Sequence, residues 1–374
     1  MPKGEILQKE EGLTIARVSG RPYDLGFQHG EMFKEEINWF YSRVQKFFDE
    51  REGQIRGKIS FFVIKRFAKK IEKFIPAELR EEMDGLAKGA GVDYDFILLI
   101  NVIEELSVIY RRLFKLHLPW SKGCSCFVAK TQAGIIWGRN LDYPVWTEFL
   151  PSQSILFVCQ PSNGYSFLSL GWPGIIGVAT AISKQNLSLI LLEAMTKKWT
   201  WQGVPGAMAT RQAIQYSQDI KIATEKFFDK PPTLGKNVVL VSKNSARVLE
   251  LSSPNVASRD FNSPSPLVVT NHFQHETMKE MVASSFLLPI LTVMPPEFFT
   301  LEGSQKRNQK LEKLCKDKEI DIARAKEVLN EVATPGTIQS MIFLPEKEEF
   351  WIAKSIQPPV TRGEWLSFKL KDLL

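Results

Sequence analysis

Cysteine and histidine are scarce in this sequence, with four of each in 374 residues. The spacing of the cysteines fits no disulfide framework; they are Cys124, Cys126, Cys159 and Cys315. Cys124 and Cys126 are separated by a single residue, and no second Cys or His pair has the spacing of zinc ligands. These absences argue against a disulfide-stapled secreted domain and against a zinc site, and they favour a reduced, cytoplasmic setting.

Long apolar runs are also missing. No stretch approaches the ~20 apolar residues that a membrane-spanning helix needs, and residues 1–20 lack the apolar core and cleavage site of a signal peptide. The chain is 44% hydrophobic and 24% charged, which is typical of a globular protein rather than a disordered one. The net charge of +6 is mild for this length and no nucleic-acid motif is present, so we expect no nucleic-acid partner.

The pattern of apolar residues changes near residue 123. Before it, residues 24–50, 57–76, 76–91 and 93–106 carry apolar positions at helical intervals. After it, short β-rich runs separated by turn residues follow one another, interrupted by helix-like stretches at 206–228 and 304–332. This order predicts an α+β fold: a four-layer α/β/β/α sandwich of two stacked antiparallel sheets with helices outside. The boundary divides the chain into 1–123 and 124–374.

Two apolar segments allow more than one interpretation. Residues 57–76 form a basic amphipathic helix that could lie on an anionic membrane, but packing of its apolar stripe on the domain is favoured; the stripe is Ile64, Phe67, Ala68, Ile71 and Phe74. Residues 282–299 contain three prolines, so one regular helix is not expected there. This segment is either a wall over a ligand pocket or part of the core.

Cys124 directly follows Gly123, which raises the question of how its thiol would be activated. A thiol needs a base or a lowered pKa to attack a carbonyl at neutral pH. A histidine could be that base, as in papain-like enzymes, but no papain-type signature surrounds Cys124. Alternatively, cleavage of the Gly123–Cys124 bond would free an α-amine with an unperturbed pKa of about 8, which can accept the thiol proton.

The residues after Cys124 predict a hairpin. Residues 126–130 and 135–140 form its arms around the turn 131–134. A hairpin returns its second arm to the start of the first, so Arg139 and Asp142 are expected close to Cys124. Arg139 would favour thiolate over thiol, and Asp142 would either bind the freed ammonium or orient a polar group of a ligand. A surface ion pair beside a hairpin end is the alternative interpretation.

The segment 123–144 resembles the N-terminal-nucleophile (Ntn) hydrolases that cut linear amide bonds. The penicillin acyltransferase family, which cleaves itself before the cysteine of a Gly-Cys pair, is the most similar. Bile-salt hydrolases, penicillin V acylases and the acid ceramidase group resemble the chain more distantly. Further segments follow the order of that family along most of the chain, namely 20–37, 78–102, 202–223, 268–273, 304–314 and 337–355.

The resemblance implies roles for individual residues. Cys124 matches the nucleophile, and Arg139 and Asp142 match a pair that lies against the nucleophile and its amine. Asn271 matches an asparagine whose side-chain N–H helps form the oxyanion hole, a donor typically worth about 3 kcal/mol. Arg307, in a Ser-x-x-Arg pattern, matches a late pocket arginine. His272 is interpreted as a structural histidine.

The resemblance implies a self-processing cysteine amidohydrolase or acyltransferase that acts on an N-acylated small molecule. It leaves open whether water, an acceptor amine or acyl-CoA takes part, and whether the chain forms a homo-oligomer. No metal or organic cofactor is implied. The penicillin acyltransferase type lacks an arginine at the position of Arg139, whereas bile-salt hydrolases have one, so penicillin chemistry itself is not expected. An uncleaved acyl-ligand-binding protein and a papain-like Cys/His hydrolase remain as alternatives.

Overall fold

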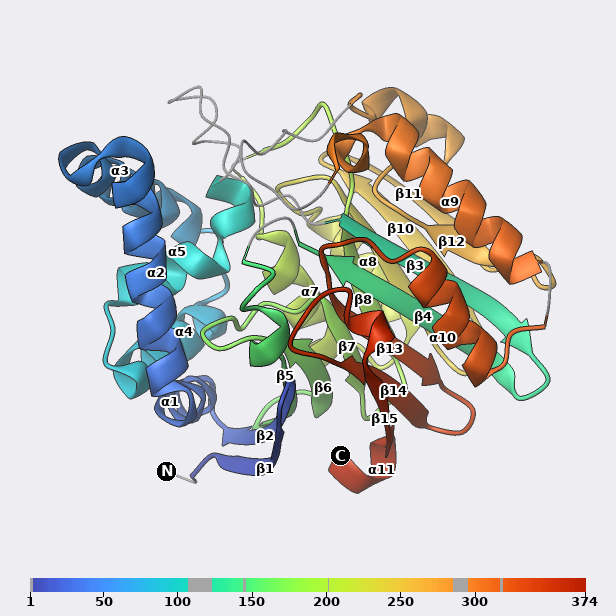
Figure 1. The fold of residues 1–374 in the computed structure, drawn as a ribbon, viewed down its shortest axis with the longest axis horizontal. Helices are drawn as coiled ribbons and strands as arrows, with labels where there is room; N and C mark the ends of the chain where they lie inside the picture. Colours follow the sequence, from blue (N-terminus) through green and yellow to red (C-terminus); the bar gives the residue numbers. More distant parts are fainter. Residues whose placement is uncertain (1–2, 107–122, 144–145, 201, 285–294, 317–318) are drawn as a thin grey trace.

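The computed structural model describes residues 3–106, 123–143, 146–200, 202–284, 295–316 and 319–374. Its strands form two sheets (Figure 1). The larger has nine strands, in the order β1 (Glu5–Glu10), β2 (Leu13–Gly20), β5 (Ile155–Pro161), β6 (Phe167–Gly171), β7 (Thr180–Ser183), β8 (Ser188–Glu193), β9 (Lys236–Val241), β10 (Ala246–Ser252) and β11 (Asn255–Asp260). All neighbours in it are antiparallel except β2 and β5.

The smaller sheet has six antiparallel strands. Their order is β12 (Leu267–Val269), β3 (Gly123–Thr131), β4 (Gly134–Asp142), β13 (Thr337–Leu344), β14 (Glu349–Lys354) and β15 (Glu364–Lys369). Strand β3 is buried on both faces, which explains its nearly continuous apolar sequence. Cys126 and Val128 face the nine-stranded sheet and belong to the main core, whereas Phe127 and Ala129 belong to a second core under the outer helices.

Helices cover the outer face of each sheet and one end of the sandwich. Helices α7 (Gly206–Tyr216) and α8 (Ile220–Asp229) contact the nine-stranded sheet, while α9 (Leu301–Lys316) and α10 (Ile322–Glu331) contact the six-stranded one. The helices of the first third lie together beside β2 and β5 (Figure 1); they are α1 (Pro22–Met32), α2 (Lys34–Glu52), α3 (Gln54–Glu72), α4 (Ala77–Ala90) and α5 (Tyr94–Asn101). The short α11 (Leu370–Leu373) follows β15. None of the described helices is both long and apolar enough to cross a bilayer.

The fold class predicted from the sequence is confirmed: the chain is an α+β sandwich of two stacked sheets with helices outside. The structure adds β1, β2, β11 and β15, which the sequence pattern did not single out. Because β1 and β2 belong to the nine-stranded sheet, the first third is not purely helical, and it shares a sheet with the rest of the chain.

Helices α1 and α4 pack unusually closely through reciprocal glycines. A β-carbon on Gly26 or Gly30 of α1 would stand 1.8 or 2.2 Å from a backbone oxygen of α4. Gly85 and Gly89 of α4 approach the backbone of α1 in the same way, at 2.1 and 2.2 Å. Gly91 ends α4 with a left-handed φ, whereas Gly85 and Gly89 lie inside the helix and allow the two backbones to meet.

Candidate active site

The predicted hairpin is present, and it places Gly123 and Cys124 at one end of β3. In the register of β3 with β4, Gly123 pairs with Asp142, Cys124 with Leu141 and Cys126 with Arg139. Because side chains alternate along a strand, Cys124, Cys126 and Arg139 share the face that packs on the nine-stranded sheet. Asp142, which pairs with Gly123, lies on the other face.

Arg139 contacts the Cys124 thiol. Its Nη2 lies 3.3 Å from Cys124 Sγ, and the guanidinium also donates to the Ala179 and Leu191 carbonyls and the Thr180 hydroxyl of the facing sheet. The side chain is only 1% exposed. A cation held by neutral acceptors in a buried site has a strong field, and that field favours thiolate over thiol. The predicted proximity of Arg139 and Cys124 is therefore observed.

Asn271 and Arg307 come from distant parts of the chain to the same place. Asn271 Oδ1 accepts from the Cys124 backbone nitrogen at 3.1 Å and from Arg307 Nη2 at 2.7 Å, while Asn271 Nδ2 donates to the Glu193 carbonyl at 2.9 Å. The carboxamide thus faces Cys124 with its oxygen. Its role as an N–H donor in an oxyanion hole is not visible in this arrangement and stays a prediction.

The carboxyl group of Asp142 is fully buried. Its Oδ1 accepts from the Thr337 hydroxyl at 2.5 Å, and its Oδ2 has no hydrogen-bond partner among the described residues. Burial raises the pKa of Asp142, which the Thr337 hydrogen bond and the positive charge of Arg307 offset only in part. A carboxyl group in this state would be stabilised as a carboxylate by a cation placed against its second oxygen.

Phe298 covers Gly123. It belongs to a short 3₁₀ helix at Pro296–Phe299, is 3% exposed, and stacks on the Arg307 guanidinium, with Cζ of Arg307 4.2 Å from the ring centroid. Phe298 lies in the apolar segment 282–299 that was considered as a pocket wall or core. Residues 285–294 of that segment lie outside the described residues, so the wall hypothesis stays open for them.

The two buried histidines bond away from the thiol. His272 Nδ1 lies 2.8 Å from the Ser304 hydroxyl and 3.2 Å from that of Thr270, and burial, with the charges of Arg259 and Arg307, lowers its pKa to about 4. His29 accepts from the Gly174 backbone through Nε2, and burial lowers its pKa to about 3. His117 lies outside the described residues.

Ser304 was not recognised as a site residue from the sequence beyond its place in the Ser-x-x-Arg pattern. Its hydroxyl accepts from the Asn271 backbone nitrogen at 2.9 Å and bonds Thr270 and His272, so it holds the segment that carries Asn271. The pattern could have indicated this role, because residues 304 and 307 lie about one helical turn apart. The other cysteines are buried, and burial raises the pKa of Cys126 and Cys159 to about 12.

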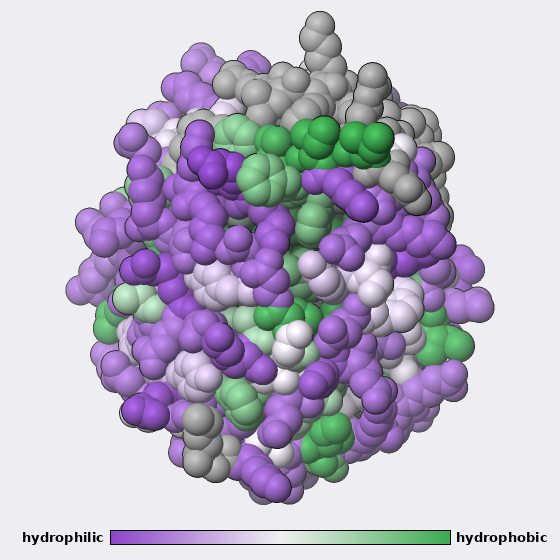
Figure 2. All heavy atoms as spheres, turned by 90° about the vertical axis from the view of Figure 1, so that its left-hand side faces the viewer, coloured by the Kyte–Doolittle hydropathy of each residue, from purple (hydrophilic) through white to green (hydrophobic). Residues whose placement is uncertain are grey.

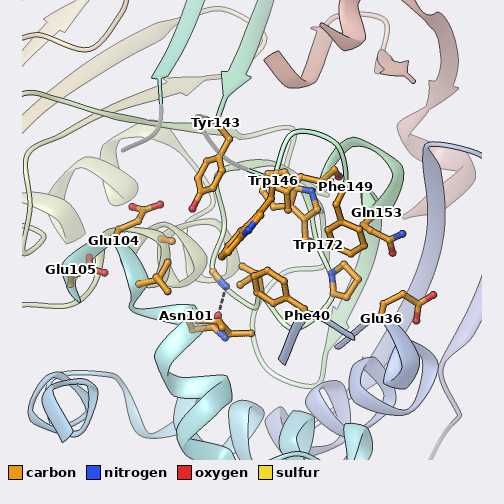
Figure 3. Close-up of a pocket in the computed structure, with 17 residues that line it drawn as sticks. Glu36, Phe40, Asn101, Glu104, Glu105, Tyr143, Trp146, Phe149, Gln153 and Trp172 are labelled. Carbon is orange, nitrogen blue, oxygen red and sulfur yellow. Dashed lines mark hydrogen bonds between the residues drawn. The ribbon is translucent and has the colours of Figure 1, made fainter. Parts of the chain in front are cut away.

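A cavity of about 90 Å³ lies between the helices of the first third and the ends of the strands (Figure 3). Aromatic and acidic side chains both line it; the aromatic ones are Phe40, Tyr143, Trp146, Phe149 and Trp172, and the acidic ones are Glu36, Glu104 and Glu105. Tyr143, which follows Asp142 directly, contributes to the lining, whereas Cys124 and Arg139 do not. The sequence alone does not reveal this cavity, because its lining comes from five separate segments.

A buried ion cluster connects the cavity to the site. Lys236 Nζ lies 2.7 Å from Glu104 and 3.3 Å from Glu193, and all three side chains are nearly inaccessible. Glu104 lines the cavity, and the Glu193 carbonyl accepts from Asn271. Burial by itself would lower the pKa of Lys236, but the surrounding carboxylates raise it, so the lysine stays charged.

No protein-family profile matches the chain. An uncharacterized protein of Archaeoglobus fulgidus is 30% identical over 244 residues, 59% of this chain and 40% of the relative. Protein dcd1B of Dictyostelium discoideum is 23% identical over 294 residues, 72% of this chain and 56% of the relative. The N-acylethanolamine-hydrolyzing acid amidase of Caenorhabditis elegans is 36% identical over 89 residues, 24% of this chain and 23% of the relative. The chain thus spans about half the length of the first two.

Two solved structures are similar in part. The Caenorhabditis elegans N-acylethanolamine-hydrolyzing acid amidase ortholog has a TM-score of 0.43 at 18% identity, over 60% of this chain and 93% of its own. A mutant of the conjugated bile acid hydrolase of Clostridium perfringens has a TM-score of 0.42 at 14% identity, over 66% of this chain and 96% of its own. Similarity at this level does not specify an activity. The penicillin acyltransferase family in particular is not among these matches.

Proposed function

We propose that the chain is an N-terminal-nucleophile amidohydrolase that cleaves itself between Gly123 and Cys124. It would then cut a linear amide bond of an N-acylated small molecule through an acyl-enzyme on Cys124. The observation that carries the proposal is the set of groups around one peptide bond. Arg139 Nη2 contacts the thiol, Asn271 Oδ1 accepts from the Cys124 nitrogen, and Asp142, whose second oxygen has no hydrogen-bond partner among the described residues, pairs with Gly123 across the hairpin.

The first step is self-cleavage. Cys124 Sγ attacks the Gly123 carbonyl carbon, the C–N bond breaks, and the leaving nitrogen of Cys124 takes the proton that the thiol gives up. Water then hydrolyses the thioester, which returns the thiol and leaves Gly123 with a carboxylate. Asp142 supports this step, because its second oxygen can accept from the new ammonium group, and that pairing offsets the burial of both charges.

The second step acts on the substrate. The freed amine, with an ordinary pKa near 8, accepts the thiol proton, and Arg139 stabilises the resulting thiolate. The thiolate attacks the substrate carbonyl, the amine product leaves, and water or an acceptor amine releases the acyl group. The cavity lined by Tyr143 supports an apolar group on the substrate, since its aromatic side chains offer stacking surface.

The comparisons support the reaction class. The C. elegans relative that is 36% identical over 89 residues is named for the hydrolysis of N-acylethanolamines. We therefore expect a small N-acyl amide as substrate. A panel of acyl-ethanolamines, N-acyl amino acids, conjugated bile salts and penicillins, with and without an added acceptor amine, would identify the acyl group and distinguish hydrolysis from transfer.

Intact-mass measurement tests the proposal directly. We expect the purified chain to give two fragments, residues 1–123 and 124–374, whose masses sum to that of the chain plus one water. Cys124→Ala should remain a single chain without activity. A wild-type chain that hydrolyses amides while uncleaved would overturn the proposal in favour of a Cys/His enzyme. A chain that stays intact and inert but binds acylated ligands would identify a binding protein.

A further inference from the structure

Helix α3 carries a second apolar surface that faces solvent. Ile55, Ile59 and Phe62 are 79%, 56% and 62% exposed, the highest values among the large hydrophobic side chains of the described residues. Their spacing of four and three residues places them on one face of the helix. Figure 2 shows a row of apolar side chains near the top of this side of the molecule, over α3.

This surface is distinct from the stripe that the sequence analysis considered for membrane contact. Ile64, Ala68 and Ile71 of that stripe are at most 2% exposed and belong to the main core. That stripe is therefore used to pack α3 on the protein. Ile55, Ile59 and Phe62 are additional to that stripe. Single apolar side chains scattered over a surface are common, but three large ones on two successive turns of one helix form a contiguous patch.

The same face continues into basic residues. Residues 66 and 69, and Lys73 at the C-terminal cap of α3, follow 55, 59 and 62 at helical spacing, so this face changes from apolar to positively charged along the helix. Lys69 is paired with Glu72 and Asp95. Four further cations make no ion pair with a carboxylate of the described residues and are exposed; they are Lys58, Arg66, Lys70 and Lys73. Glu72 is the one acidic residue of α3.

We propose that this face of α3 docks on a lipid bilayer that contains anionic lipids. Ile55, Ile59 and Phe62 would enter the boundary between head groups and acyl chains, and the basic residues would contact lipid phosphates. Residues 55 to 62 span about 10 Å along the helix axis, so the apolar part of this face is about two turns long. Interfacial helices lie in the plane of the bilayer and bury such a face about 5–10 Å deep. Basic residues near a negatively charged leaflet add to the apolar attraction.

Charge complementarity selects this occupant over a second copy of the chain. A symmetric dimer on this face would bring two sets of basic residues into close opposition, which disfavours association. An anionic bilayer instead neutralises them. The inference does not depend on the proposed amidase activity, because none of these residues belongs to the site at Cys124.

Sedimentation with vesicles tests the proposal on the full chain. We expect the wild type to co-sediment with vesicles of phosphatidylcholine and phosphatidylglycerol, and at least tenfold more weakly with phosphatidylcholine alone. Ile59→Gln/Phe62→Gln and, independently, Arg66→Gln/Lys70→Gln/Lys73→Gln should each reduce binding to the anionic vesicles about tenfold or more. Added salt should weaken wild-type binding, since it screens the basic residues.

Ile356→Gln is the matched control, because Ile356 is also exposed, at 41%, but lies far along the chain after β14. It should bind as the wild type does. Absence of binding to anionic vesicles at low salt, or equal binding by the wild type and both α3 variants, would overturn the proposal. Concentration-dependent self-association that Ile59→Gln/Phe62→Gln abolishes, without vesicle binding, would instead identify a second copy as the occupant. Thermal unfolding of each variant verifies its folding.

Discussion

The ring of Phe298 lies directly against Gly123. A β-carbon on residue 123 would stand 1.6 Å from Cζ and 2.3 Å from Cε1 of that ring, distances that no packed side chain tolerates. Gly123 also supplies the carbonyl that the proposed self-cleavage attacks. The packing of Phe298 and the geometry of the scissile peptide thus depend on the same missing side chain, and a substitution pair can separate them.

Gly123→Ala should slow self-cleavage strongly, because the new methyl group displaces either the Phe298 ring or the strand that carries the scissile bond. Phe298→Leu removes the clashing ring atoms and keeps a buried apolar side chain, so Gly123→Ala/Phe298→Leu should recover a large part of the rate. Time courses of fragment formation by intact mass measure this. Phe298→Leu alone is the control. Cleavage of Gly123→Ala at the wild-type rate would contradict the role given to Phe298.

Arg139 should control the reactivity of the thiol. Arg139→Met removes the charge and the donor to Sγ, and a lost hydrogen bond to a charged group costs about 1.5–3 kcal/mol, so we expect self-cleavage to slow by roughly one to two orders of magnitude. Arg139→Lys keeps the charge but lacks the branched guanidinium that contacts Ala179 and Cys124 together. Its rate of self-cleavage should therefore lie between those of the wild type and Arg139→Met. The midpoint of thermal unfolding verifies that Arg139→Met is folded. If the folded variant cleaves itself at the wild-type rate, the guanidinium has only a structural role.

Asn271 and His272 should behave differently although they are neighbours. Asn271→Ala removes the contacts to the Cys124 nitrogen and to Arg307, so cleavage and turnover should both drop. His272→Gln can still bond Ser304 and should retain most activity, because the ring is neutral and bonds away from the thiol. Rates of cleavage and amide hydrolysis for both variants measure this. The opposite order, with His272→Gln inactive and Asn271→Ala active, would favour a papain-like mechanism.

Acid should destabilise the fold partly through its buried histidines. The pKa of His29 is about 3 in the folded chain, lowered by burial from its ordinary value of 6.5. Below pH of about 6.5 the unfolded chain binds a proton that the folded chain does not, so stability falls as pH decreases until the folded pKa is reached. The limit for one such histidine is roughly a tenfold change in the unfolding equilibrium per pH unit.

His29→Gln tests this relation, since glutamine can accept from Gly174 but does not titrate. Urea unfolding at pH 7 and pH 5 should show a smaller loss of stability in the variant than in the wild type. Ser60→Ala, a change at another buried polar position in the first third, should leave the wild-type pH dependence in place. Equal pH dependence in His29→Gln and the wild type would mean that His29 does not titrate as its burial implies.

Much of the site near Cys124 could be predicted from local sequence. The alternation of residues and the short turn at 131–134 fix the hairpin, and the hairpin brings Arg139 to the thiol and Asp142 to the preceding peptide. The strands that local pattern missed are informative. β1 and β2 precede helices and pair at the edge of a sheet whose other strands lie far along the chain, so their nature depends on partners that the local sequence does not contain.

The sequence by itself determined the α+β class, the hairpin, and the residues able to act on a thiol, because strand and helix periods and turn chemistry are local. Only the tertiary structure decided that Asn271 meets the Cys124 nitrogen with its oxygen, that Phe298 lies on Gly123, and that Ile55, Ile59 and Phe62 face solvent. The first two relations join segments that are far apart in sequence, up to 175 residues for Phe298 and Gly123. The third depends on which of the two apolar faces of α3 is buried. The periodicity of the sequence shows that a helix face is apolar, but only the packing of the folded chain determines what that face contacts.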